Sequence, residues 1–138
     1  MRACRGLVFL AGMVVLAQMG VAQSASCPVE FTKVNRAWGS SDQVWYQLKN
    51  TSDKTIVGTI VGMVMYDATN TATKGWFDYP STAKVKPNKV MGAALDKSFE
   101  GAYSQRGVKV FLKKALFEDG STWQDDGTHS CAKADLKK

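Results

Sequence analysis

The sequence predicts an all-β protein, an antiparallel β-sandwich of about seven strands. Apolar and polar residues alternate with a period of two in several short segments, a pattern typical of half-buried strands. Turn-forming residues separate these segments about every ten residues, which is the spacing expected of a sandwich. No segment of useful length has the periodicity of a helix. Cys27 and Cys131 enclose nearly all of the predicted strands.

The expected strands cover seven segments: 29–34, 43–50, 55–67, 81–86, 90–95, 108–117 and 122–124. In the second of them, Trp45 lies on the wetter face, opposite the apolar positions Val44, Tyr46 and Leu48. Polar turns with Asn, Asp, Pro or Gly separate the segments, and Asp119-Gly120 is a strong hairpin signal.

The segment 55–67 is apolar on both faces and therefore predicts the central strand. Gly58 and Gly62 interrupt it. A glycine inside a strand indicates a bulge or the close approach of another group, such as a packed aromatic ring. We therefore expect one of these two features at each glycine.

Residues 1–22 have the order of a signal peptide: two arginines, an apolar run over 6–17, and then small residues. The run is shorter than the roughly 20 apolar residues of a spanning helix, so we expect no stable membrane span. Cleavage after Ala22 and cleavage after Ser24 both fit the small-residue rule, which leaves the boundary within 22–26. These features predict a secreted or periplasmic protein.

Cys4 lies in the predicted signal, so the mature chain keeps two cysteines, Cys27 and Cys131. An even count in an oxidising compartment predicts a disulfide. Closing a loop of 104 residues between them stabilises a fold by about 4 to 5 kcal/mol in the chain-entropy model. Two alternatives remain: two independent buried thiols, or a lipid-modified Cys27, which would leave Cys131 without a partner. We expect one domain over 27–131 and a basic flexible tail over 132–138.

Removing the signal takes two of the 18 basic residues and none of the 12 acidic ones, so the mature chain carries a mild charge of +4. The lysines are spread along the chain. Nucleic-acid-binding proteins concentrate basic residues on one face, among aromatic residues. We therefore expect no nucleic-acid partner.

The central strand ends in Met63-Val64-Met65-Tyr66-Asp67, which resembles the Phe-x-Leu-Tyr-Asp signature of FxLYD-type domains. The resemblance extends to the segment 48–51 and to the Pro87-Asn88 turn. The two ends of the chain, 27–34 and 117–131, resemble those of small secreted bacterial proteins of unknown function. The resemblance to FxLYD-type domains implies an immunoglobulin-like sandwich outside the cytoplasm. The resemblance of the two ends supports the disulfide and the sandwich and carries no catalytic residues.

His129 is the only histidine, and it follows Asp125 and Asp126 in a turn. These three side chains are acceptable metal ligands, but the sequence has no second cluster to complete the site. A hydrolase would use His129 as its base together with Asp or Glu, yet no serine lies in a Gly-x-Ser-x-Gly elbow. We expect no metal, no cofactor and no catalytic residues, and interpret the segment as a turn.

The chain has four tryptophans: Trp38, Trp45, Trp76 and Trp123. Trp45 and Trp76, with Tyr79 beside the latter, are the candidate ligand-binding aromatics, because exposed rings can stack on a sugar or a peptide. The alternative is that they fill the core. We predict a non-enzymatic binding or structural module at the cell envelope, with an unknown protein or glycan partner. The alternatives are glycan or peptide binding through exposed aromatics, and a small hydrolase. The sequence does not determine the oligomeric state.

Overall fold

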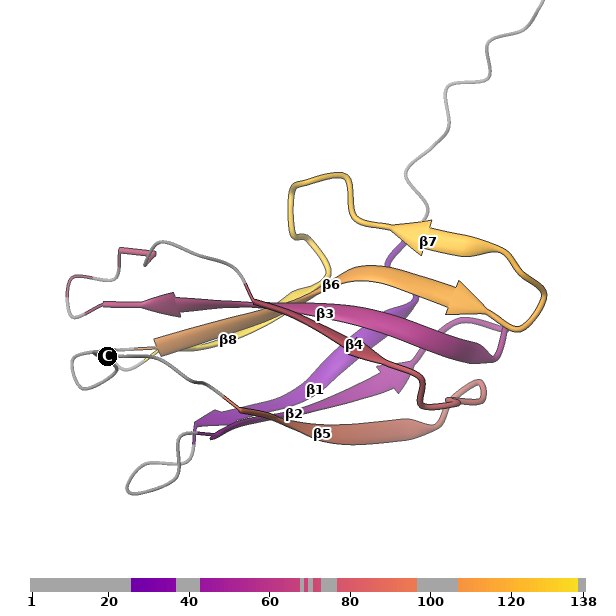
Figure 1. The fold of residues 1–138 in the computed structure, drawn as a ribbon, viewed down its shortest axis with the longest axis horizontal. Helices are drawn as coiled ribbons and strands as arrows, with labels where there is room; N and C mark the ends of the chain where they lie inside the picture. Colours follow the sequence, from indigo (N-terminus) through magenta and orange to yellow (C-terminus); the bar gives the residue numbers. More distant parts are fainter. Residues whose placement is uncertain are drawn as a thin grey trace, which may run out of the picture.

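The computed structural model describes residues 26–36, 43–67, 69, 71–72, 77–96 and 107–136. The predicted signal peptide, Trp38 and Trp76 lie outside these ranges. Figure 1 shows the described strands in two layers. The eight strands are β1 (Val29–Arg36), β2 (Gln43–Asn50), β3 (Ile56–Tyr66), β4 (Phe77–Ser81), β5 (Val90–Asp96), β6 (Gly107–Phe117), β7 (Thr122–Gln124) and β8 (Ala132–Leu136).

One layer, sheet A, has the order β1-β2-β5, and the other, sheet B, has the order β4-β3-β6-β7 with β8 also paired to β6. All pairings are antiparallel. An immunoglobulin-like sandwich has its first, second and fifth strands in one sheet and its third, sixth and last strands in the other. The two sheets of this chain divide the strands in the same way. The predicted fold class is confirmed.

The core lies between the sheets and uses alternate residues of the long strands. Its fully buried side chains come from both layers: Val44, Leu48, Ile56, Val61, Met63, Met65, Val108, Val110 and Leu112. The predicted division of β2 is confirmed, since Val44, Tyr46 and Leu48 face inward. Among the described residues, no helix is long and apolar enough to cross a membrane.

Two expectations for the strands were wrong. Of the segment 81–86, only Ser81 lies in a strand, as the last residue of β4, while Val85 makes an isolated bridge to Ile56. The strand thus lies earlier in the chain than expected, at β4, which pairs with β3, includes Pro80 and lies at the sheet edge, where a proline is tolerated. Residues 132–136, expected in a flexible tail, form β8, because pairing with β6 satisfies their backbone groups.

Both glycines of β3 fulfil their predicted roles. The register shifts between Ile56 and Gly58, which marks a bulge. At Gly62 a Cβ atom would lie 2.3 Å from the ring of Phe111. Phe111 is buried on the outer side of sheet B, where its ring contacts the glycine.

Asn50, at the end of β2, is completely buried. Its Nδ2 group donates to the carbonyls of Lys54 and Val85, both at 2.8 Å. Its Oδ1 atom accepts from the backbone N–H and the hydroxyl of Ser52, at 3.0 and 2.7 Å. Its own backbone N–H donates to the Lys89 carbonyl at 3.0 Å. A buried amide is tolerated because these bonds satisfy it.

Lys54 joins the turn after β2 to the β6–β7 hairpin. Its ammonium lies 2.7 Å from Asp119 Oδ2 and donates to Ser121 Oγ at 3.0 Å. The hydrogen bond from Lys54 and those from Ser121 hold the pKa of the Asp119 carboxyl well below its ordinary range. Asp119 belongs to the predicted Asp-Gly hairpin, where Gly120 has a φ of 82°.

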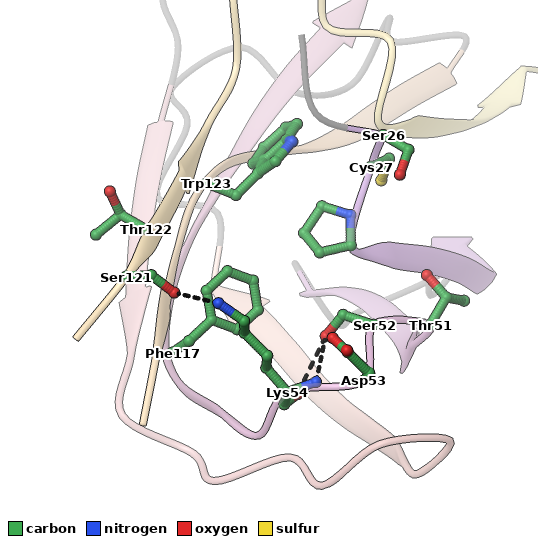
Figure 2. A pocket seen from close by; sticks show the side chains of 11 residues that line it. Ser26, Cys27, Thr51, Ser52, Asp53, Lys54, Phe117, Ser121, Thr122 and Trp123 are labelled. Carbon is green, nitrogen blue, oxygen red and sulfur yellow. Dashed lines mark hydrogen bonds between the residues drawn. The ribbon is translucent and has the colours of Figure 1, made fainter. Parts of the chain in front are cut away.

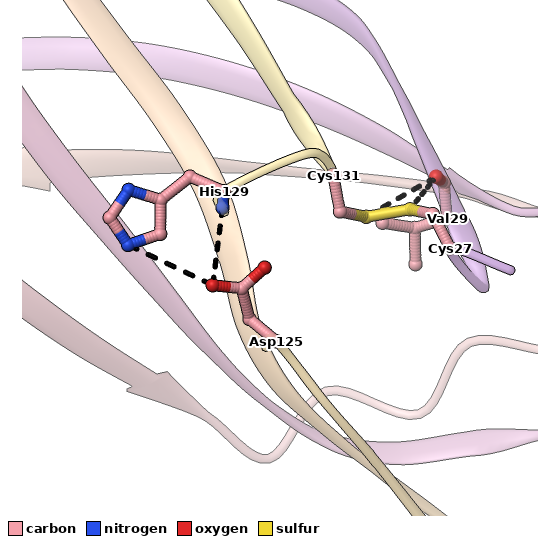
Figure 3. The surroundings of a disulfide bond; sticks show 5 residues. All are labelled: Cys27, Val29, Asp125, His129 and Cys131. Atoms are coloured by element: carbon pink, nitrogen blue, oxygen red, sulfur yellow. Dashed lines mark hydrogen bonds and ion pairs between the residues drawn. A yellow bond between two sulfur atoms is a disulfide. The ribbon is translucent and has the colours of Figure 1, made fainter. Parts of the chain in front are cut away.

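The Cys27–Cys131 disulfide joins the chain just before β1 to the chain just before β8. It therefore links sheet A to sheet B (Figure 3). The two Cα atoms are 5.5 Å apart, a normal separation for a disulfide. Cys131 is buried, and its carbonyl accepts from the Leu112 N–H at 2.8 Å.

We predict that Asn50→Ala lowers the free energy of unfolding by roughly 2 to 4 kcal/mol, because it removes the four hydrogen bonds of a buried side-chain amide. Urea denaturation measures this loss. Asn35→Ala, at an exposed position on β1, serves as the control and should change stability by at most about 0.5 kcal/mol. Equal losses in the two variants would contradict the role of Asn50.

The ion pair of Asp119 predicts an acid-dependent loss of stability. Because the pKa of Asp119 is lowered in the folded protein, its stabilising effect is present above the ordinary carboxyl pKa of about 4 and is lost as the pH falls below it. The urea midpoint of Asp119→Asn should thus be slightly below that of the unchanged protein at pH 7, and this difference should shrink as the pH is lowered from 4 to 2. The control is Asp53→Asn, in the turn that holds Lys54. A midpoint difference as large at pH 2 as at pH 7 would rule out this origin.

For the disulfide, we predict that a Cys4→Ser chain denatured without reductant binds no maleimide. After reduction it should bind two, as counted by mass spectrometry. Replacing Cys27 and Cys131 by serine should cost up to about 4 to 5 kcal/mol of stability, because the unfolded chain regains its freedom. Two maleimides bound before reduction would show that the bond does not form.

Candidate functional site

Trp45 is 51% exposed on the outer face of sheet A. Its neighbours along β2, Val44 and Tyr46, are buried, and alternate residues of a strand point to opposite faces. Across the sheet, Trp45 pairs with Asn35 of β1 on one side and with Ala94 of β5 on the other. The indole therefore stands on an open sheet between a polar and a small residue.

A depression of about 310 Å³ lies beside this indole. It is lined by Lys33, Asn35, Trp45, Tyr46, Gln47 and Gly92. Gly92 of β5 pairs with Gln47, and a Cβ at Gly92 would lie 3.4 Å from Gln47 Cγ and 3.6 Å from the Tyr46 carbonyl oxygen. The missing side chain of Gly92 helps to open the depression.

The polar side chains around the depression have no side-chain partner among the described residues. Lys33, Asn35 and Gln47 are exposed, and none of them makes a side-chain hydrogen bond or ion pair with another described residue. Their amide and ammonium groups are available to a ligand. A half-exposed aromatic ring beside unengaged polar groups is typical of a binding site.

A second cavity, of about 360 Å³, lies at the end of the sandwich near the disulfide (Figure 2). Its apolar wall includes Pro28, Phe117 and Trp123. Its cation, Lys54, is already bonded to Asp119 and Ser121. The polar rim of this cavity thus stabilises the fold, unlike the rim around Trp45.

His129 belongs to a packed turn on the outer side of sheet B. Its ring stacks on Phe111 with centroids 4.0 Å apart, and its Nε2 lies 3.7 Å from Asp125 Oδ2 (Figure 3). The same carboxylate oxygen accepts from the His129 N–H at 3.3 Å. The Asp125 side chain is only 7% exposed. His129 lines neither cavity described above.

The carboxylates of this turn bond its own backbone. Asp125 also accepts from the Gly127 N–H, and Asp126 accepts from the hydroxyl and the N–H of Thr128. The Thr128 hydroxyl bond, above all, lowers the pKa of Asp126. In the part of the chain that the structure describes, no three His, Cys, Asp or Glu side chains form a group that could hold a metal ion.

The structure separates the aromatic candidates. Trp45 is exposed on sheet A, whereas Tyr79 of β4 is half-buried and packs against the core. Trp76, the third candidate, lies outside the described residues. Trp123 is 8% exposed and lines the end cavity. Of the described candidates, only Trp45 presents its ring on an open face.

Several residues of the site were missed by sequence reasoning. Lys33, Asn35 and Gln47 were not singled out, and neither were Gly92 and Ala94. A signal was present in β5, where three consecutive small residues include the two that face outward, Gly92 and Ala94. Its meaning depends on which strand pairs with β5 and in what register, which the sequence leaves open.

No protein family and no curated protein sequence matches this chain. Among solved structures, the chain is similar to a hypothetical protein from Peptoclostridium difficile 630. The TM-score is 0.52 at 11% sequence identity, and the match covers 72% of this chain and 87% of that chain. The likeness concerns the fold, a β-sandwich shared with that hypothetical protein.

Proposed function

We propose that this protein is a non-enzymatic binding module that acts outside the cytoplasm and binds a glycan on the outer face of sheet A. The observation that carries the proposal is Trp45, half-exposed beside a depression whose polar side chains have no partner among the described residues. A buried aromatic would have argued for a purely structural role.

The chemistry of the site suits a sugar. A pyranose ring has an apolar face of C–H groups, which stacks on an indole, and a rim of hydroxyls, which bond amides and ammonium groups. Trp45 supplies the flat apolar surface, while Asn35 and Gln47 supply amides on the neighbouring positions. Lys33 adds a cation that suits an acidic sugar.

The other sheet provides a contrast. Phe111 also points away from the core, yet it is fully buried, because His129 stacks on it. The chain thus covers the outward aromatic ring of sheet B and leaves that of sheet A open. An exposed indole gives up the hydrophobic stabilisation that burial would provide. A binding role accounts for the exposure of Trp45.

The proposed location rests on two features. The N-terminal segment has the order of a signal peptide, and the Cys27–Cys131 disulfide suits an oxidising compartment. A relation to FxLYD-type domains is part of the proposal. Two segments that carry the resemblance, around Asn50 and Asn88, lie together, since the Asn88 N–H donates to the Asn50 carbonyl at 2.9 Å.

We predict that a soluble glycan quenches or shifts the tryptophan fluorescence and that Trp45→Ala weakens its binding by about tenfold or more, equivalent to about 1.4 kcal/mol. The probes are chitohexaose, cellohexaose and muropeptides from digested peptidoglycan, with affinities measured by titration calorimetry. Gly92→Val should also weaken binding, because it fills the depression while suiting a strand.

The matched control is Leu116→Ala, which removes an exposed apolar side chain, 41% exposed, from β6 of the other sheet. Its affinity for the glycan should equal that of the unchanged protein. Failure of all three probes to bind, or equal loss in the Leu116 and Trp45 variants, would refute glycan binding at this face.

A further inference from the structure

Beyond the proposed glycan site, we propose that the free edge of β5 binds an extended peptide segment of a protein partner, which joins sheet A as a fourth strand. β5 is the last strand of sheet A. Within the described part of the chain, no strand pairs with its other side. Its unpaired backbone groups therefore offer a template for another strand.

The other described edges are protected. β4 has only five residues and includes Pro80, and β7 has three. β1 has a register shift after Phe31, and Lys133 of β8 donates from its Nζ to the Thr32 carbonyl at 3.1 Å. Short length, proline, bulges and lysine are the devices by which proteins block unwanted strand addition.

β5 has none of these devices. Its seven residues pair with β2 without any register shift, from Val90 opposite Lys49 to Asp96 opposite Gln43. It contains no proline, lysine or arginine, and its single charge is at its end. An edge that is long, regular and uncharged is an aggregation hazard unless it has a partner.

The hydrogen-bond pattern shows which groups face the free edge. The Asn50 N–H donates to the Lys89 carbonyl, so this pair holds a hydrogen-bonded position of the β2–β5 ladder. Because such positions alternate, Met91, Ala93 and Leu95 bond to β2. The N–H and C=O groups of the residues between them point to the free edge: Val90, Gly92 and Ala94.

The side chains beside this edge indicate what the partner segment contains. Gly92 and Ala94 leave space on the outer face, which bulky side chains of an added strand would fill. Val90 is 52% exposed and offers an apolar contact.

Positive charge lies at the Val90 end of the edge. Lys86 and Lys89 are exposed in the turn before β5, and Lys49 lies opposite Val90. No carboxylate of a described residue forms an ion pair with these three lysines. The partner segment is therefore acidic at the end that lies beside Val90 and apolar at alternate positions along the rest.

The test selects binders from a phage-displayed library of random linear nonapeptides, using the purified protein. We expect an enriched pattern of acidic residues at one end and alternate bulky apolar residues. The synthesised peptides should slow amide hydrogen exchange at Gly92 and Ala94, measured by NMR. A library without an enriched pattern, or protection of β4 or β1 in place of β5, would overturn the proposal.

Two variants of one residue separate backbone pairing from side-chain effects. Ala94→Pro removes an outward N–H and should weaken peptide binding by about tenfold or more, whereas Ala94→Val keeps this N–H, fills only the side-chain space, and should weaken binding clearly less than Ala94→Pro. If Ala94→Pro does not fold, the Lys86→Glu, Lys89→Glu double variant decides, because it should weaken acidic peptides by a similar factor. Unchanged affinity of this double variant for acidic peptides would contradict the proposal.

Two further outcomes are distinguishable. In the first, the unchanged protein sediments as a dimer and the Ala94→Pro variant as a monomer. This result would show that a second copy occupies the edge and would overturn the peptide assignment. Trp45→Ala should weaken glycan binding by about tenfold or more and leave the exchange protection by peptides at Gly92 intact. The test of the β5 edge is therefore independent of the test of the glycan site.

Discussion

The buried side chain of Asn50 is the interaction on which the rest of this sandwich depends. It bonds the turn after β2, the segment at Val85 and, through its backbone, the turn that starts β5. One residue thereby joins the turn that follows it to the segment 85–89, which begins 35 residues further along the chain. Because a buried amide is costly when unpaired, only the one arrangement that satisfies all of its bonds is favourable.

The register of β5 follows from this network, and the candidate site follows from the register. With the Asn50–Lys89 pair fixed, Gly92 comes to lie opposite Gln47, and Ala94 opposite Trp45. A shift of one residue would turn Met91, Ala93 and Leu95 to the outer face and Gly92 and Ala94 to the core. The open depression, and the set of backbone groups that faces the free edge, are thus two results of one alignment.

The two outer faces of the sandwich differ in how they are covered. On sheet B, Gly62 admits the ring of Phe111, and the turn with His129 and Asp125 packs over it. The disulfide at Cys131 holds the chain that follows this turn. On sheet A, β5 ends the layer, and Trp45 remains exposed. The outward aromatic ring of Phe111 on sheet B is therefore covered by the chain itself, whereas the indole of Trp45 on sheet A is not.

The sequence by itself determined the sandwich, most of its strands and its closure by Cys27 and Cys131. Period-two alternation, turn residues and an even cysteine count are local or compositional signals that do not depend on distant contacts. The same signals placed Trp45 outward and anticipated the ring against Gly62. The tertiary structure alone decided that a strand forms at 77–81 in place of 81–86 and that residues 132–136 pair with β6. It also decided that Lys33, Asn35, Gln47 and Gly92 surround the indole. These features depend on which strands become neighbours and in what register, and both are set by long-range packing and by the bonds of one buried asparagine.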